Sequence, residues 1–133
     1  MPITISTSKQ LLNIDFITDF LSQTYWAEGR TKEKMHRLIE NSLNFGVYLN
    51  DEQIGYARLV TDYGQFAYLM DVFIIPEHRR KGYSKVLMEF ILNHNDLQEV
   101  MVWRLATADA HKLYNQFGFT LLSKPENMME LMK

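Results

Sequence analysis

The stretch FAYLMDVFIIPEHRRKGYSKVLMEFI, residues 66–91, decides the fold. Residues 66–75 are apolar at almost every position, which predicts a central strand covered on both faces, and Pro76 ends it. The next apolar side chains recur at the i, i+3, i+4, i+7 and i+8 spacing of an amphipathic helix: Tyr83, Val86, Leu87, Phe90 and Ile91. The stretch therefore predicts a buried strand, a turn and a helix in direct succession.

The turn between this strand and this helix is basic. Four cations lie in or beside it, which are Arg79, Arg80, Lys81 and Lys85. A helix that starts in solvent more often places an acidic residue or a capping side chain there, so the cations indicate an anion. Gly82 lets the backbone approach a ligand, and free amides of the first helical turn can bind phosphate oxygens. We expect a diphosphate at this turn, although a solvated basic loop explains the same residues.

The rest of the chain predicts one mixed α/β (α+β) domain over residues 1–133. Alternating or helical apolar spacing predicts strands at 3–5, 45–49, 54–60, 66–75, 100–105, 119–122 and 128–132, and helices at 14–21, 31–43, 83–91 and 107–117. Thr31 is the expected N-cap of the second helix. The predicted order is therefore β-α-α-β-β-β-α-β-α-β-β.

Composition excludes several classes of protein. The chain has 133 residues, of which 47% are hydrophobic and 23% charged, as in an ordinary globular domain. It has no cysteine, which excludes disulfides, thiolate metal sites and a cysteine nucleophile, and fits the cytoplasm. A net charge of -2 argues against general nucleic-acid binding, and no apolar stretch approaches the roughly 20 residues that span a bilayer. The histidines lack metal-ligand spacing, so we expect no metal.

Two segments resemble the motifs of one family. Residues 72–84, VFIIPEHRRKGYS, resemble the acyl-CoA-binding motif of the GNAT superfamily of N-acetyltransferases, which reads Gln/Arg-x-x-Gly-x-Gly/Ala after a strand that ends in Pro. Arg79 and Gly82 match this motif, and Ser84 stands where Gly or Ala is usual. Residues 110–119, AHKLYNQFGF, resemble the Ala-x-x-Leu-Tyr-x-x-x-Gly-Phe segment of the same family. The resemblance implies a central mixed, mostly antiparallel sheet flanked by helices.

The resemblance also implies the ligand, which is acetyl-CoA as a cosubstrate. Its pantetheine arm would pair with the central strand and its pyrophosphate would lie on the amides of the basic turn. The expected cofactor-binding residues are Val72, Phe73, Ile74, Arg79, Arg80, Lys81, Gly82, Tyr83, Ser84, Lys85 and Thr107. Thr107 occupies the position where many members carry an Asn that bonds the cofactor arm.

Asp71 and Tyr114 are the candidate catalytic residues. Asp71 is the only carboxylate in the apolar central strand, where a charge is costly without a purpose or a partner, so it is the candidate base for the amine. It could act directly or through water, or it could merely anchor a loop. Tyr114 matches the family's tyrosine, whose phenol can protonate the departing thiolate, although a packed aromatic explains it too. A central-strand amide, of Phe73 or Ile74, would hold the oxyanion.

An aromatic cluster with one arginine is the candidate substrate site. Its residues are Tyr25, Trp26, Arg30, Tyr63 and Tyr68. They suit a small amine with an apolar body or a carboxylate, such as an amino acid, better than a protein lysine. Core packing or an interface explains the same residues.

The sequence thus predicts an acetyl-CoA-dependent N-acetyltransferase that works by direct attack in a ternary complex. The alternative is an acyl-CoA-binding sensor or regulatory module without turnover. A nucleic-acid module built on the basic turn is a third possibility, which the net charge opposes. We expect a monomer or homodimer with neither nucleic acid nor membrane as a partner.

Overall fold

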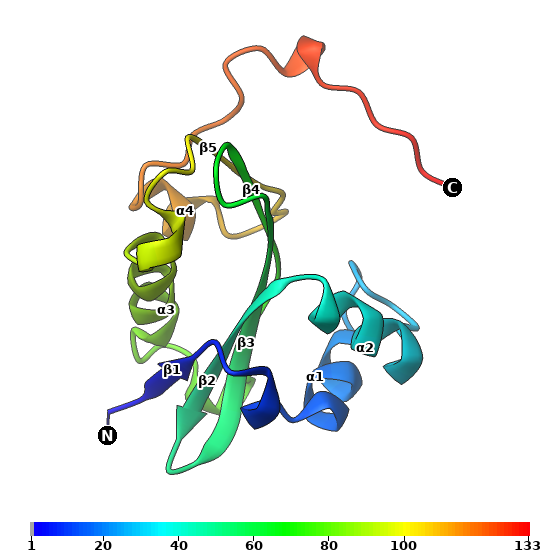
Figure 1. The fold of residues 1–133 in the computed structure, drawn as a ribbon, viewed down its shortest axis with the longest axis vertical. Helices are drawn as coiled ribbons and strands as arrows, with labels where there is room; N and C mark the ends of the chain where they lie inside the picture. The colour runs from blue at the N-terminus through cyan, green and yellow to red at the C-terminus, as the bar shows by residue number, and fades with distance from the viewer. Residues whose placement is uncertain (1) are drawn as a thin grey trace.

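Five strands form one sheet in a computed structural model that describes residues 2–133 (Figure 1). They are β1 (Thr4–Ser6), β2 (Leu43–Leu49), β3 (Glu52–Thr61), β4 (Phe66–Ile74) and β5 (Val102–Leu105), and they lie in the sheet in this order. The pairs from β1 to β4 are antiparallel, whereas β4 and β5 are parallel. The predicted mixed, mostly antiparallel sheet is confirmed.

Helices cover both faces of the sheet (Figure 1). They are α1 (Ile14–Leu21), α2 (Lys32–Glu40), α3 (Tyr83–Leu92) and α4 (His111–Asn115). The first two pack with Tyr56 and Phe73 into one apolar cluster, and the last two pack on the opposite face. The predicted N-cap is confirmed, because the Thr31 hydroxyl accepts a hydrogen bond of 3.1 Å from the amide of Lys34. No helix of the described residues is both long and apolar enough to span a membrane.

The sheet opens between β4 and β5. These strands pair only from Phe66 opposite Val102 to Leu69 opposite Leu105, and β4 continues to Ile74. Two residues of β4, Asp71 and Val72, stand opposite one residue of β3, which is a β-bulge. β5 ends at Leu105, so the second half of β4 pairs with no described strand on the side of the opening.

The two predicted C-terminal strands are wrong for this chain. Residues 119–122 and 128–132 pair with no strand of the part that the structure describes, and the segment holds only a 3₁₀ turn at Pro125–Asn127. Apolar residues alone do not make a strand, because a strand also needs a backbone partner. The observed order therefore ends at α4, and the first nine predicted elements are confirmed.

Candidate active site

A cavity of about 520 Å³ lies where β4 and β5 part. Its lining comes from three segments: the loop before α2, the middle of β4, and the loop from the end of β5 into α4. Eight of the predicted site residues line it, namely Tyr25, Trp26, Arg30, Tyr68, Asp71, Val72, Thr107 and Tyr114. Residues far apart in the sequence thus meet in one place, and both candidate catalytic residues are among them.

Tyr114 is held inside the protein by α4. Its side chain is buried, and its ring packs edge-on against Phe119 with the centroids 6.0 Å apart. Burial raises the pKa of the Tyr114 phenol, and the negative charge of Asp109 raises it further. A tyrosine phenol is already protonated at neutral pH, and the raised pKa keeps it protonated at higher pH as well, so it can donate a hydrogen bond.

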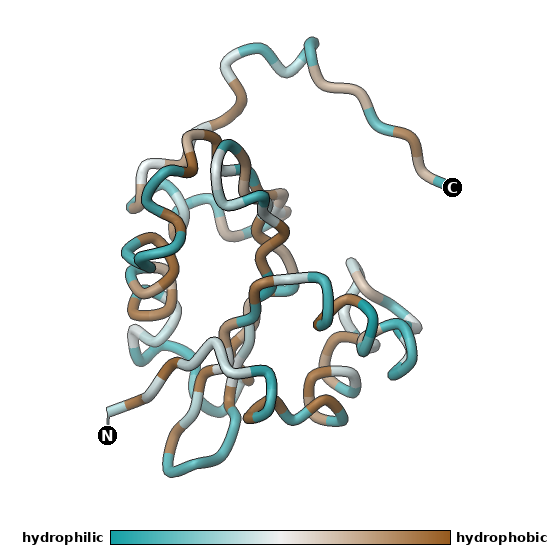
Figure 2. The backbone as a smooth tube through the Cα atoms, viewed as in Figure 1, coloured by the Kyte–Doolittle hydropathy of each residue, from teal (hydrophilic) through white to brown (hydrophobic). Residues whose placement is uncertain are grey.

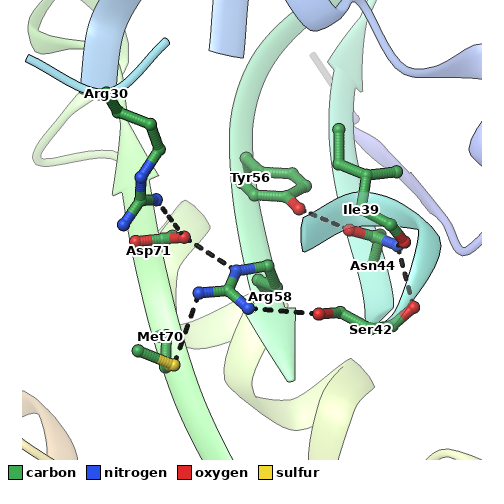
Figure 3. A network of polar contacts seen from close by, with 8 residues as sticks. All are labelled: Arg30, Ile39, Ser42, Asn44, Tyr56, Arg58, Met70 and Asp71. Carbon is green, nitrogen blue, oxygen red and sulfur yellow. Dashed lines mark hydrogen bonds and ion pairs between the residues drawn. The ribbon is translucent and has the colours of Figure 1, made fainter. Parts of the chain in front are cut away.

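Asp71 lies at the bulge, with a φ of 55° that aspartate tolerates better than most residues. Its Oδ2 accepts a hydrogen bond of 2.6 Å from Nη1 of Arg30 and one of 2.8 Å from Nε of Arg58 (Figure 3). The carboxylate is buried, as is the Arg58 side chain. A proton on the Asp71 carboxylate would remove the charge that attracts both arginines, so the ion pairs favour the anchoring role. The base role stays a prediction.

Arg58 extends this network and was missed by the sequence analysis. Its Nη1 donates to the Ser42 hydroxyl over 3.1 Å, and its Nη2 contacts the Met70 sulfur (Figure 3). The sequence does contain a sign of this role, because Arg58 lies in the middle of the apolar strand β3. A cation there needs a buried anion as much as Asp71 needs a cation. The two arginines therefore join β3, β4 and the loop before α2.

The loop before α2 forms one wall of the cavity. Tyr25 and Trp26 are exposed there, with their rings 5.1 Å apart and nearly perpendicular. Arg30 joins this loop to the sheet through Asp71. Tyr63 does not line the cavity, because it lies in the exposed turn between β3 and β4. The predicted substrate role is therefore not supported for Tyr63.

The basic turn presents backbone amides at the start of α3. Arg80 and Gly82 take positive φ values of 64° and 81°, which direct the chain into the helix. Within residues 2–133, no side chain caps this start and its first turn has no acid. A Cβ added to Gly82 would meet no atom within 4 Å, so the space over it is open. This start of α3 can accept an anion.

Other predicted cofactor residues serve the structure as well. Nε of Arg79 donates to the carbonyl oxygen of Ile74 over 2.8 Å, which joins the turn to the end of β4. The Thr107 hydroxyl accepts a hydrogen bond of 3.0 Å from the amide of Ala110, which shapes the loop before α4. Phe73 stacks on Phe20 with the centroids 4.0 Å apart. Among the described residues, no group of three or more metal-ligating side chains could hold a metal ion.

Comparisons with known proteins agree with this architecture. The sequence model of the Acetyltransferase (GNAT) family matches residues 9–119. A crystal structure from Xanthomonas campestris pv. campestris, described as a GNAT family protein, is 43% identical with a TM-score of 0.97 and covers 100% of this chain and 94% of that chain. A Gibberella zeae protein, named provisionally as an acetyltransferase, is 29% identical over 136 residues, which are 84% of this chain and 75% of that protein. A Clostridium acetobutylicum protein crystallised with acetyl-CoA is 14% identical, has a TM-score of 0.74 and covers 98% of this chain and 96% of that one, which shows the fold alone.

Proposed function

The chain belongs to the acetyltransferase (GNAT) family, and from this premise we propose that it transfers the acetyl group of acetyl-CoA to a primary amine by direct attack in a ternary complex. The observation that carries the proposal is the cavity at the parting of β4 and β5, which Tyr114 lines together with Asp71 and Thr107. An acyl donor and an amine can meet there beside a proton donor.

The start of α3 and the free edge of β4 suit acetyl-CoA. In the proposal, the amides of residues 80–85 bind the pyrophosphate, and the nearby cations add long-range attraction. The pantetheine arm pairs with the backbone of Val72, Phe73 and Ile74, where β5 no longer pairs with β4. Thr107 lines the cavity and can donate its hydroxyl proton to this arm.

Transfer forms a C–N bond and breaks the C–S bond of the thioester. The neutral amine attacks the carbonyl carbon, and the amide of Phe73 or Ile74 donates to the oxygen as it becomes negative. When the tetrahedral intermediate collapses, the Tyr114 phenol gives its proton to the CoA sulfur. The amine loses one proton on the way, and that proton returns to Tyr114 through solvent.

Asp71 has two roles open to it in this proposal. Its ion pairs with Arg30 and Arg58 make it a positioning residue that fixes one wall of the cavity. As a base, it would take the amine proton directly or through water, and the proton would remove the charge that attracts both arginines. We assign it the positioning role first, and the pH profile described below separates the two.

The amine is proposed to be a small molecule with an apolar body or a carboxylate. Tyr25, Trp26 and Tyr68 offer aromatic surface along the cavity, and Arg30 offers a cation beside it. Since one Arg30 nitrogen is held by Asp71, the guanidinium would meet a substrate carboxylate in a fixed orientation.

A thiol-release screen over amino acids, polyamines, aminoglycosides and peptides tests the proposal. Turnover with one amine class, with initial-rate lines that intersect when both substrates are varied, is the expected result. The alternative, an acyl-CoA-binding module without turnover, gains support from the occupied Oδ2 of Asp71. Acetyl-CoA binding without release of CoA for any amine would favour that alternative, and parallel lines would refute direct transfer.

A further inference from the structure

The C-terminal tail, residues 120–133, is exposed at every position. Figure 1 shows it running past β5 and away from the sheet, and Figure 2 shows apolar stretches along it. Its large apolar residues are Leu121, Leu122, Met128, Met129, Leu131 and Met132, of which Met129 is 94% exposed and Leu131 80%. So many apolar side chains on one short segment mark a surface that is covered by something.

Residues 120–123 of the tail line a groove together with β5, and the residues after them are all exposed. The one polar contact that joins it to the rest of the described chain runs from Nη1 of Arg104 to the sulfur of Met128 over 2.8 Å. Four of the five residues at 128–132 are apolar, which is why a strand is predicted there. No strand of residues 2–133 pairs with this segment.

A groove of matching character lies along β5. Its volume is about 420 Å³, and it is lined by residues 101–104, by residues 117–123 and by Leu92 at the end of α3. β5 is the last strand of the sheet, so one of its edges carries unpaired backbone groups. Its residues are all only half-buried, and Met101 just before it is 77% exposed. The groove thus lacks the strand that would cover it.

We propose that Met128–Met132 of one copy lies in this groove of a second copy and pairs with the outer edge of its β5, while the second copy does the same in return. Each copy offers both a tail and a groove, so the exchange closes on itself as a twofold dimer. The apolar tail side chains become buried, and the free edge of the sheet disappears. The inference does not depend on the proposed function.

The path of the tail favours a second copy over the chain's own groove. The 3₁₀ turn at Pro125–Asn127 separates Met128–Met132 from the groove wall, and the tail continues away from the sheet (Figure 1). Exchange of a terminal segment between identical copies costs little because the same contacts form in either arrangement.

Engineered disulfides test this arrangement directly, because the chain has no cysteine. Met101→Cys is combined in one chain with Met129→Cys or with Met132→Cys, so that either strand direction is sampled. We expect a disulfide-linked dimer on a non-reducing gel from at least one pair. A disulfide within one monomer, or no link from either pair, would overturn the proposal. Leu11→Cys with the same tail cysteines is the control, because Leu11 is exposed away from the groove.

Molar mass by light scattering gives an independent test. We expect the unaltered chain to be a dimer, and Leu131→Glu to raise its dissociation constant on the order of 10²-fold or more, since two such side chains leave apolar surroundings per dimer. Leu11→Glu, at an equally exposed leucine, should leave the dimer intact. A monomeric unaltered chain, or a dimer as tight in Leu131→Glu as in the unaltered chain, would contradict the exchange.

Discussion

Replacing Asp71 by asparagine removes the charge that joins two arginines. Arg58 and Arg30 have side chains that are 5% and 14% exposed, so neither gains much solvation when its partner is lost. Breaking a buried ion pair by removing one partner costs about 3–5 kcal/mol. Asparagine keeps one oxygen that can accept a hydrogen bond, so we expect Asp71→Asn to lower the free energy of unfolding by about 3 kcal/mol. For a domain of this length, that lowers the Tm by about 10 °C.

Urea unfolding followed by circular dichroism measures this loss. Asp19→Asn is the matched control, because Asp19 is exposed on α1 and has no ion pair with a described residue, and we expect it to change stability by less than about 0.5 kcal/mol. If Asp71→Asn is as stable as Asp19→Asn, the ion pairs do not anchor the loop, and the reasoning from burial is refuted.

The pH profile of the same variant separates the two roles of Asp71. In the positioning role, Asp71→Asn lowers turnover by a factor that does not change with pH. In the base role, turnover recovers partly as rising pH deprotonates the amine without help. We expect the first pattern, and recovery at high pH would instead identify Asp71 as the base.

Two further changes have defined outcomes. Gly82→Val should weaken acetyl-CoA binding, as measured by calorimetry. Gly118→Val is the control, because Gly118 also has a positive φ and open surroundings, so it should cost similar stability and leave binding unchanged. Equal acetyl-CoA affinities of the two variants would show that the turn is not the binding site. Hydrogen bonds from the amides of Phe66, Gln65 and Gly64 lower the pKa of the Asp62 carboxyl from 3.8 to about 2. These hydrogen bonds therefore stabilise the folded chain fully above pH 3.8, and this stabilisation is lost as the pH falls through about 2. An NMR titration of Asp62 with a midpoint near 3.8 would contradict this.

Local patterns predicted the parts of this protein that depend on local sequence. The apolar run and the helical spacing in residues 66–91 predicted β4 and α3, and Thr31 was predicted as a cap from its place just before the second helix. The position of Asp71 inside an apolar strand showed that it needed a partner. The sequence did not identify Arg58 as that partner, because the two meet only through the register of β3 against β4.

The errors have a physical cause too. Residues 128–132 carry a strand pattern, but a pattern does not supply the pairing partner, and within the described chain none is present. Tyr63 was predicted as a substrate residue because it flanks the approach to the central strand, but it lies in the turn between β3 and β4 and does not line the cavity. Strand pairing and cavity lining both depend on how the folded backbone brings distant segments together, which local sequence does not show.

The central claim is that Tyr114 protonates the departing CoA. Its most direct test is the catalytic constant of Tyr114→Phe with the best amine from the screen, under conditions where the chemical step limits the rate. Phenylalanine keeps the ring that packs against Phe119 and removes only the donor, so stability and acetyl-CoA affinity should hold. We expect the catalytic constant to fall on the order of 10² to 10⁴-fold without recovery at high pH. Turnover close to that of the unaltered chain would contradict the assignment.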